Sequence, residues 1–430
     1  MSPILQVALD FVDLPRALKL AEEAVKGGAD WLEAGTPLIK SVGLDCIRRL
    51  REKFPKATIV ADMKTMDVGR MEVEMAAKAG ANVISILALS SESTIRECVE
   101  AAGNYGARIM ADLLEVPSVA EKAKCLEARG VDYICLHTSI DEQMQGRIKF
   151  KDVRAVAASA SIPVAVAGGI NSENAVDAVR TGAGIIVVGG AITKADNATE
   201  ATVKIKKAIE KKIKVKTQLY RRVSAREEDI RETFMKVSCA NISDAMHRQE
   251  GLKDIVPVST GKKMVGRAVT VRTYPGDWAK PVEAIDHAPQ GSVMVIDAGG
   301  VGPAVWGELA THSAIERGLC GVVIDGALRD VEDIRRLNFP AYSALITPAA
   351  GEPRGFGEMD IPVTVGGVKV YPGDWIVGDG DGVLVIPREK AVEIANRAMD
   401  VLERENRIRR EIKDGQTLGQ VTELLKWEKK

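Results

Sequence analysis

The sequence predicts an α/β protein in which a (β/α)8 barrel precedes a second α/β domain of different architecture, and three observations predict it. Between residue 4 and about residue 212, short apolar runs alternate with amphipathic helical stretches. Such runs are typical of strands buried on both faces, and their alternation with helices indicates a parallel sheet. After about residue 225 the alternation becomes irregular, and Gly, Pro and Asp become frequent.

The first region has eight strand-like runs. Eight units of strand and helix in about 210 residues fit a closed (β/α)8 barrel, and an open doubly wound sheet is the alternative. Helical spacing between the strands is clear at Leu14–Lys26, Arg70–Ala79 and Asn171–Thr181. The expected strands are Ile4–Asp10, Trp31–Gly35, Thr58–Lys64, Asn82–Ala88, Arg108–Leu114, Tyr133–Thr138, Pro163–Gly169 and Ile185–Gly190.

A domain boundary is expected where the helix Ala198–Lys212 runs into the basic, extended segment Ile213–Arg222. We place the barrel at 1–212, a linker at 213–224 and the second domain at 225–430, beginning with a helix at Ala225–Lys236. Tyr-Pro-Gly-Asp-Trp occurs at 274–278 and again at 371–375. Because the flanks do not align further, we interpret the two copies as similar Pro-Gly turns leading into strands, not as a repeat.

Composition excludes several classes of function. The chain of 430 residues carries a net charge of −1, so neither a nucleic-acid nor a membrane partner is expected. Its six cysteines include no CxxC pair, which favours reduced thiols over a disulfide framework or a zinc site. The N-terminus lacks the basic and apolar regions of a signal peptide, and no apolar stretch approaches about 18 residues. We therefore expect a cytoplasmic protein.

Titratable side chains stand at the ends of five of the eight expected strands. In a parallel barrel the functional groups lie at the C-terminal ends of the strands, where the βα loops converge. A single Asp there is often a helix N-cap, but a set at five strand ends indicates a catalytic centre. Its members are Asp10, Glu33, Asp62 with Lys64, Asp112 and His137.

The last two strands each end in a pair of glycines, Gly168-Gly169 and Gly189-Gly190. Glycines there let backbone N–H groups approach an anion, and the loops after strands 7 and 8 are the usual phosphate grip of this fold. The sequence therefore predicts a phosphorylated substrate.

Lys64 has two alternative roles. A Schiff-base nucleophile needs a neutral amine, whereas Asp62 and Asp67 on either side hold the lysine charged. We therefore expect an ammonium that stabilises negative charge. Glu33 and Asp62 offer oxygen ligands for Mg²⁺, and a metal that bridges a ketone and its neighbouring hydroxyl would stabilise an enediolate. His137 is then a proton shuttle, with a structural histidine as the alternative.

The motif Asp62-Met63-Lys64-Thr65-Met66-Asp67 matches the D-x-K-x-x-D signature of the orotidine-monophosphate decarboxylase superfamily. Together with Leu32-Glu33-Ala34-Gly35-Thr36-Pro37, the strand-6 histidine and the glycine pairs, it makes residues 3–212 resemble the 3-hexulose-6-phosphate synthase family. The resemblance implies a dimeric, Mg²⁺-dependent aldehyde-lyase that condenses formaldehyde with D-ribulose 5-phosphate, or runs in reverse. In this superfamily Asp67 would complete the site of the neighbouring subunit.

These considerations assign roles to the barrel residues. The catalytic residues are expected to be Asp10, Lys64, Asp67, Asp112 and His137. Substrate contacts are expected from Gly168, Gly169, Gly189 and Gly190, and metal ligation from Glu33 and Asp62.

The alternative is a 3-keto-L-gulonate-6-phosphate decarboxylase, a related family with the same metal ligands. The decarboxylases tend to carry Glu near the end of strand 5, Arg three residues beyond the strand-6 His, Thr before the strand-7 glycines and Arg after the strand-8 Gly. Losing two arginines would remove bidentate partners of a carboxylate or phosphate. The synthase is therefore favoured by the residues that this chain has instead, which are Asp112, Ile140, Ala167 and Gly190.

The densest polar segment of the second region lies between Gly299 and Asp333. Glycines before a helix can present backbone amides to a small anion, and Arg329 is a natural partner of a carboxylate. Asp330, with Asp333 or Glu332, can hold a hydrated divalent metal. The segment therefore predicts a site for a 2-oxo acid on Mg²⁺. A surface helix N-terminus with a charge cluster is the alternative.

The span Asn241–Pro387 is similar to the family that contains the regulator of ribonuclease activity A and 4-hydroxy-4-methyl-2-oxoglutarate aldolase, a β/β/α type of domain. In the aldolases an acidic residue is followed, after twenty intervening residues, by Arg-Asp, and a further acidic residue lies three positions later. This pattern is matched by Glu308, Arg329, Asp330 and Asp333. The resemblance implies trimers with sites between subunits and a second divalent metal on Asp330. It also implies substrate contacts from Gly307, Glu308, Leu309 and Arg329.

Two hypotheses follow. One is a bifunctional enzyme in which the synthase is fused to a 2-oxo-acid aldolase or decarboxylase. The other is an enzyme whose second domain is not catalytic and binds a ribonuclease or only oligomerises. The barrels would pair about a two-fold axis, and the second domains would assemble about a three-fold axis. Because one chain carries both interfaces, we expect a homo-oligomer that closes as a hexamer.

Overall fold

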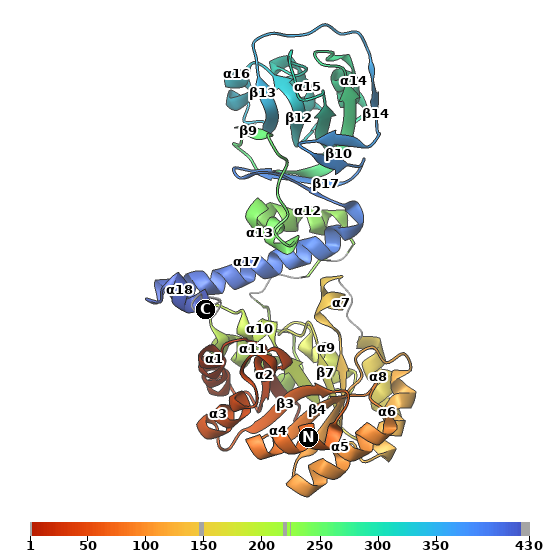
Figure 1. Ribbon diagram of the computed structural model, residues 1–430, viewed down its shortest axis with the longest axis vertical. Helices are drawn as coiled ribbons and strands as arrows, with labels where there is room; N and C mark the ends of the chain where they lie inside the picture. The colour runs from red at the N-terminus through yellow and green to blue at the C-terminus, as the bar shows by residue number, and fades with distance from the viewer. Residues whose placement is uncertain (1, 146–149, 218–221, 224, 423–430) are drawn as a thin grey trace. The chain divides into compact units, whose positions relative to one another are not determined.

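The structure, a computed structural model, describes residues 2–145, 150–217, 222–223 and 225–422 (Figure 1). The chain forms two compact units. The first holds the chain up to Gln143, the stretch Arg147–Arg221 and the chain from Glu403 onward. The second holds Met144–Gly146 and Arg222–Leu402.

The first unit is a closed barrel of eight parallel strands in the order of the sequence, so the predicted barrel is confirmed. Each strand begins within one residue of its expected start. The strands are β1 (Ile4–Leu9), β2 (Trp31–Ala34), β3 (Thr58–Thr65), β4 (Val83–Leu87), β5 (Arg108–Asp112), β6 (Tyr133–His137), β7 (Val164–Ala167) and β8 (Ile185–Val188).

Helices surround the barrel (Figure 1). The helix after β7 is shorter than expected, because the Asn171 side chain accepts from the amides of Glu173 and Asn174 and forms a turn there instead. The helices are α1 (Leu14–Lys26), α2 (Thr36–Val42), α3 (Asp45–Lys53), α4 (Gly69–Ala79), α5 (Glu92–Tyr105), α6 (Val119–Ala128), α7 (Ile140–Met144), α8 (Phe150–Ser159), α9 (Ala175–Arg180), α10 (Gly190–Thr193) and α11 (Ala198–Lys211).

The barrel has two apolar layers, as strands with alternating side chains require. One lies between the strands and the helices and includes Leu5, Leu9 and Ile84. The other fills the inside of the barrel and includes Val60 and Tyr133. Because both faces of each strand are covered, the polar groups are left at the strand ends.

The second unit is built on a mixed sheet in the order β18-β17-β10-β11-β12-β13-β9, with β14 beside β10. The four strands from β10 to β13 are parallel, and the helices α14, α15 and α16 connect them. These helices pack on one face of the sheet, while the hairpin β15–β16 covers the other. The strands are β9 (Val256–Ser259), β10 (Met264–Thr273), β11 (Val293–Asp297), β12 (Gly321–Leu328), β13 (Ala341–Ile346), β14 (Gly357–Met359), β15 (Val363–Val365), β16 (Val368–Val370), β17 (Trp375–Asp379) and β18 (Gly382–Ile386).

Up to Leu402, the helices of the second region form two groups. One group connects the parallel strands, and the other packs with β17 and β18 around Phe234 and Trp375. The helices are α12 (Glu227–Lys236), α13 (Cys239–Ala245), α14 (Ala279–His287), α15 (Glu308–Glu316), α16 (Val331–Arg336), the 3-10 turn Arg388–Lys390, α17 (Ala391–Lys413) and α18 (Leu418–Thr422).

The chain from Glu403 onward belongs to the barrel unit, although the expected second domain extended to residue 430. Arg407 explains the difference. Its Nη1 donates to the carbonyl of Ala195 at 2.9 Å, its Nε donates to Glu411 at 2.9 Å, and its Nη2 lies 3.6 Å from Glu23 of α1. Apolar periodicity alone does not tell which unit such a helix covers.

The two Tyr-Pro-Gly-Asp-Trp segments are turns of the same kind. In each, the Asp amide donates to the Tyr carbonyl, at 2.9 Å in 274–278 and 3.1 Å in 371–375, and the Gly has a positive φ. The expected turns are therefore confirmed, but only the second leads into a strand. The first leads into α14.

Two further findings concern the chain as a whole. All six cysteines lie in the described part of the chain, and each is a free thiol. Among the described helices, none is both long and apolar enough to cross a lipid bilayer.

Candidate functional site

Lys64 lies where β3 departs from regular strand geometry. The pairing of β3 with β4 shifts register between Ala61 and Thr65, and Lys64 itself has a φ of +48°. Left-handed backbone is unfavourable for a residue with a side chain, and bulges often re-aim side chains beside active sites. Here the ammonium turns back onto its own strand and donates to Asp62 at 2.8 and 3.0 Å.

A second carboxylate, at the end of β5, meets the same ammonium. Lys64 donates to Asp112 Oδ2 at 3.2 Å, and Nδ1 of His137 lies 3.1 Å from that oxygen. Asp112 Oδ1 accepts from the amide of Leu114 at 3.0 Å. Asp62, Lys64, Asp112 and His137 therefore form one hydrogen-bonded chain.

The opposite charges in this hydrogen-bonded group stabilise one another. Burial alone would lower the pKa of Lys64, but the negative charges of Asp62 and Asp112 outweigh it and the pKa is raised. Burial alone would raise the pKa of Asp112, but the hydrogen bond and charge of His137, with the charge of Lys64, lower it. Lys64 is thus an ammonium and Asp112 a carboxylate at neutral pH.

Glu33 is a buried carboxyl among other acids. Burial raises its pKa well above the usual value, and the charges of Asp62 and Asp10 raise it further. The Gln6 amide donates to Glu33 Oε2, and Thr36 donates to Asp62 Oδ2 at 2.8 Å.

Asp10 closes the group at the end of β1. Its carboxylate lies against Gly35, and a Cβ added to Gly35 would overlap Asp10 Oδ1. A Cβ added to Gly189 would lie 3.3 Å from Asp10 Oδ2. The glycines at the ends of β2 and β8 thus leave room for the Asp10 side chain.

The glycine after β7 is required by close packing. Gly168 has a φ of +100°, and a Cβ there would overlap the carbonyl oxygen of Thr138. Gly168 and His137 line a cavity of about 370 Å³ at the C-terminal end of the barrel. Apolar side chains such as Leu136 and Val166 form much of the rest of the lining.

Asp67 stands apart from the group. It is exposed, and its carboxylate accepts from the amide of Val68 at 2.8 Å. Val68 has a φ of +56°, a strained conformation for a β-branched residue. The loop after β3 therefore leaves Asp67 exposed to solvent.

Four polar groups meet in the second unit at the C-terminal end of β12. Asp330 Oδ2 accepts from the amide of Glu308 at 3.1 Å and lies 3.4 Å from Arg329 Nε. A Cβ on Gly307 would come within 2.6 Å of the same carboxylate oxygen. His312 Nε2 in turn lies 2.9 Å from Glu308 Oε1. Three residues of the expected pattern, Glu308, Arg329 and Asp330, thus lie together in one cluster at the start of α15.

Asp330 has a φ of +59° and follows a register shift between Ile324 and Ala327 in the pairing of β12 with β13. Leu309 is 78% exposed beside the cluster. Asp333 pairs with Arg336 on its own helix at 2.9 Å and does not join the cluster.

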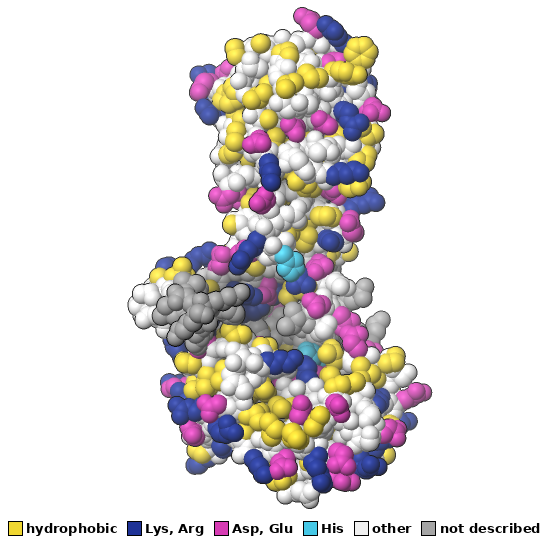
Figure 2. Space-filling view, in the orientation of Figure 1, with side chains coloured by type: hydrophobic (Ala, Val, Ile, Leu, Met, Phe, Trp, Pro, Cys, Tyr) yellow, Lys and Arg dark blue, Asp and Glu magenta, His cyan; other side chains and the backbone are white. Residues whose placement is uncertain are grey.

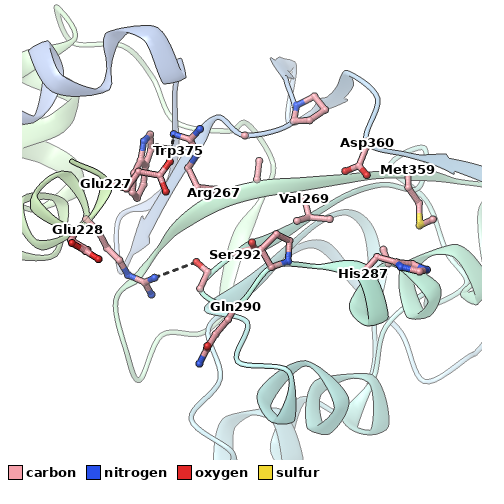
Figure 3. A pocket seen from close by; sticks show the side chains of 17 residues that line it. Glu227, Glu228, Arg267, Val269, His287, Gln290, Ser292, Met359, Asp360 and Trp375 are labelled. Carbon is pink, nitrogen blue, oxygen red and sulfur yellow. Dashed lines mark hydrogen bonds and ion pairs between the residues drawn. The ribbon is translucent and has the colours of Figure 1, made fainter. Parts of the chain in front are cut away.

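A larger cavity lies elsewhere in the second unit. It measures about 660 Å³ and lies at the N-terminal ends of β10 and β11, the opposite end of these strands from Arg329 (Figure 3). Arg267 reaches toward Glu227 and Trp375 there, 3.4 Å from the Glu227 carboxylate and 5.4 Å from the centre of the indole ring. Three acidic side chains (Glu227, Glu228 and Asp360) and two arginines (Arg231 and Arg267) line the cavity.

In the described part of the chain, no three His, Cys, Asp or Glu side chains stand together as a ready metal site. Both expected metal sites therefore depend on two carboxylates or fewer, with other ligands to come from substrate and water.

The chain matches known proteins in two separate regions. Residues 3–205 match the orotidine 5'-phosphate decarboxylase/HUMPS family. The 3-hexulose-6-phosphate synthase of Bacillus subtilis is 35% identical over 206 residues, 48% of this chain and 98% of that protein. The chain belongs to this family.

Residues 239–385 match the aldolase/RraA family, so the second region carries an RraA-like domain. Two solved structures are also similar. A 3-hexulose-6-phosphate synthase is 34% identical with a TM-score of 0.47, covering 49% of this chain and all of that one. The RNA-processing inhibitor RraA from Thermus thermophilis is 31% identical with a TM-score of 0.34, covering 36% of this chain and 94% of that one.

Two residues of the barrel site were not among the expected site residues. Gln6 holds Glu33, and Thr36 holds Asp62. A signal for Gln6 was available, because it is the one polar side chain within the apolar run Ile4–Leu9. Thr36 lies at the start of α2, where a threonine usually caps the helix. Its hydrogen bond to Asp62 on β3 could therefore not be predicted from its position in the sequence.

Proposed function

We propose that the barrel is a 3-hexulose-6-phosphate synthase, which joins formaldehyde to D-ribulose 5-phosphate in an aldol condensation or runs in reverse. The hydrogen-bonded chain of Asp62, Lys64, Asp112 and His137 supports this most strongly. It combines a permanent positive charge with a titratable ring at the end of the barrel where substrates bind in this fold. The B. subtilis relative bears the name of this activity.

The carboxylates fit the Mg²⁺ that the family implies. Burial raises the pKa of Glu33, and repulsion from the charges of Asp62 and Asp10 raises it further. A divalent cation held by Glu33 and Asp62 would relieve that repulsion. When bound, Mg²⁺ would polarise the ketone of ribulose 5-phosphate and stabilise the enediolate that attacks formaldehyde.

Lys64 would stabilise negative charge on the substrate. Its raised pKa keeps the ammonium charged, so it donates hydrogen bonds and does not form a Schiff base. The carboxylates of Asp62 and Asp112 hold it in position, at 2.8 and 3.2 Å. A charge fixed in this way needs little reorganisation when charge develops on the substrate oxygen.

His137 would move the proton. Asp112 engages Nδ1, which leaves Nε2 to exchange a proton with the substrate. His137 lines the 370 Å³ cavity, so its ring is within reach of a molecule bound there.

The loop after β3 supports an oligomer. Large apolar side chains are exposed on this loop, on α4 and after β4, and Figure 2 shows hydrophobic side chains gathered on that face of the barrel unit. Contiguous exposed apolar patches of this kind mark interaction surfaces. A second barrel bound there would bring Asp67 to its neighbour's site. The exposed residues are Met66, Val68, Met71, Met75 and Leu89.

The second candidate for the barrel is a 3-keto-L-gulonate-6-phosphate decarboxylase. Its substrate carries an additional carboxylate that needs cationic partners. Ile140 and Gly190 stand where the decarboxylases tend to carry arginines, so the synthase is the better candidate.

We propose further that the RraA-like domain is a lyase for a 2-oxo acid and depends on a divalent metal. Arg329 would bind the carboxylate, and Asp330 would hold the metal. The two side chains lie together, partly exposed, beside the backbone of Gly307 and Glu308. A domain that binds a ribonuclease or only oligomerises is the alternative, since a regulator has no need of this cluster.

The barrel proposal is tested by incubating the full chain with ribulose 5-phosphate, formaldehyde and Mg²⁺. We expect the protein to consume formaldehyde only when ribulose 5-phosphate and Mg²⁺ are both present. A parallel reaction with 3-keto-L-gulonate 6-phosphate measures CO₂ release. CO₂ release without formaldehyde consumption would replace the synthase by the decarboxylase.

A further inference from the structure

Gln6 is a buried amide in the interior of the barrel. It is 1% exposed on β1, between the fully buried apolar residues Leu5 and Val7. Its Nε2 donates to Glu33 Oε2 on β2, whereas its own Oε1 is buried and accepts from no group in the described part of the chain. An apolar side chain of similar shape would avoid the cost of that unpaired oxygen, about 1–3 kcal/mol. What the amide provides is therefore the hydrogen bond to Glu33.

That hydrogen bond occupies one of the two oxygens of Glu33. Among the described residues, no other side chain or amide donates to this carboxylate. Ligating carboxylates in metal sites are themselves commonly held by hydrogen bonds from residues that do not bind the metal. Oε1 is thus the oxygen that Glu33 can give to a cation without losing its bond to Gln6.

Asp62 is restricted in a similar way. Its Oδ2 accepts from Thr36 Oγ1 and from Lys64 Nζ, both at 2.8 Å, whereas its Oδ1 accepts from Lys64 alone at 3.0 Å. Thr36 Oγ1 also lies 2.8 Å from the main-chain carbonyl oxygen of Asp62, so the hydroxyl is fixed against β3. Each of the two proposed metal ligands therefore has one oxygen with more donors than the other.

Two carboxylates that each give one oxygen suit a small cation. Mg²⁺ demands near-ideal octahedral geometry and keeps several waters, whereas Ca²⁺ takes about six to eight oxygens and often uses both oxygens of a carboxylate. Glu33 could offer both oxygens only by losing its hydrogen bond from Gln6. For Asp62 the same change would cost the hydrogen bond from Thr36. These two hydrogen bonds therefore act against the larger ion.

We propose that Gln6 and Thr36 are positioning residues that make the barrel site prefer Mg²⁺ to Ca²⁺. Gln6 keeps Glu33 to one oxygen, and Thr36 does the same for Asp62. The proposal rests on the proposed function, because it takes Glu33 and Asp62 as the metal ligands. It adds that the choice of ion depends on two side chains that hold the ligands and do not bind the ion.

Cation binding is measured in the absence of substrate, with Mn²⁺ as the probe. Mn²⁺ is suited by the same oxygen ligands, and electron paramagnetic resonance measures the free ion while Mg²⁺ or Ca²⁺ competes for the site. Every protein is a full chain with Asp330→Asn, here called the parent chain, so that the proposed metal ligand of the RraA-like domain is removed. Glu33→Gln in the parent chain should show no saturable binding of Mn²⁺.

Gln6→Met replaces the amide by an apolar side chain of similar shape. It should weaken Mg²⁺ binding by about 10- to 100-fold, the usual effect of losing a residue that holds a metal ligand. Ca²⁺ binding should weaken by less than about threefold, because Glu33 can then offer both oxygens. Thr36→Val should lower the preference for Mg²⁺ in the same direction. Thr202→Val removes a buried hydroxyl on α11 and is the control, so it should bind both ions like the parent chain.

The outcomes separate this proposal from the proposed function. If Gln6→Met keeps the parent chain's ratio of Mg²⁺ to Ca²⁺ affinity, the proposal is overturned and the metal site stands. If Gln6→Met does not fold, the same ratio in Thr36→Val decides. If Glu33→Gln binds Mn²⁺ like the parent chain, the metal site is wrong and the proposal falls with it. Formaldehyde consumption by the wild type tests the synthase activity separately.

Discussion

Lys64 Nζ lies 3.2 Å from Asp112 Oδ2, although β3 and β5 are not neighbours in the barrel. The contact crosses the C-terminal end of the barrel and ties the signature motif on β3 to the strand that also holds His137 through Asp112. The ammonium stabilises two carboxylates at once, and each carboxylate keeps the ammonium charged. This mutual dependence leads to the first prediction.

Replacing Lys64 by Met should lower kcat/KM for the condensation by about 100- to 1,000-fold, the usual effect of removing one fixed stabiliser of developing charge. It should also destabilise the barrel, because Asp62 and Asp112 would remain buried without their cation. Formaldehyde consumption and thermal unfolding measure the two effects. Lys124→Met, on the exposed side of α6, is the matched control and should change neither.

His137→Gln keeps a polar group at the end of β6 but removes the titratable ring. We expect kcat to fall by about 100- to 10,000-fold, as is usual for a lost general acid–base, with little change in KM. Steady-state kinetics with varied ribulose 5-phosphate provides the measurement. A variant with normal kcat would make His137 a structural residue.

Asp277 in the first Tyr-Pro-Gly-Asp-Trp turn predicts a pH dependence of stability. Burial alone would raise its pKa, but hydrogen bonds from four backbone amides outweigh it and lower the pKa below the usual 3.8. A lowered pKa means that the carboxylate stabilises the fold above about that pH and loses this effect as the pH falls below it. Asp277→Asn should therefore cost about 1–3 kcal/mol at pH 7 and progressively less below pH 4.

Denaturant unfolding at pH 7 and at pH 3 compares Asp277→Asn with the wild type. Asp286→Asn, which removes an exposed carboxylate, should cost less than about 1 kcal/mol at either pH. An equal loss for Asp277→Asn at both pH values would mean that the charge of Asp277 does not matter.

Met71 tests the association surface of the barrel. Met71 is 58% exposed in the apolar patch beside Asp67. If two barrels meet there, Met71→Glu should place charges in the interface and split the assembly. Light scattering should then show a hexamer for the wild type and trimers for the variant. A monomeric or dimeric wild type would contradict the expected combination of two-fold and three-fold contacts.

Arg329 tests the second domain. With oxaloacetate and Mg²⁺, the full chain should release CO₂ and pyruvate in equal amounts, and Arg329→Ala should reduce this by at least about 100-fold, because the carboxylate loses its partner. Arg336→Ala, on the exposed side of α16, is the control. If the wild type is inactive and Arg329→Ala alters nothing, a regulatory or assembly role is the better explanation.

The fold of the first region could be predicted from the sequence because its signals are local. Strands such as Ile185–Val188 are apolar without interruption, and α1 has the boundaries that its periodicity indicated. Strand order then follows, since parallel strands joined by helices close into a barrel. The polar residues at the strand ends were found for the same reason.

The remaining features depend on contacts that no local pattern encodes. Nothing around Lys64 indicates a positive φ, because the bulge arises from the pairing of β3 with β4. The sequence also does not show that Arg407 packs against Ala195, because the two residues are far apart in the chain. Asp333 fitted the spacing of the family pattern, yet it pairs with Arg336 on its own helix.

The most direct test of the barrel's function is formaldehyde consumption by Asp62→Ala. Asp62 binds both Lys64 and Thr36 and is one of the two proposed metal ligands. With ribulose 5-phosphate and Mg²⁺ present, we expect the wild type to consume formaldehyde and the variant to show no consumption above background, while circular dichroism shows both folded. Full activity of Asp62→Ala would contradict the assignment of the active site.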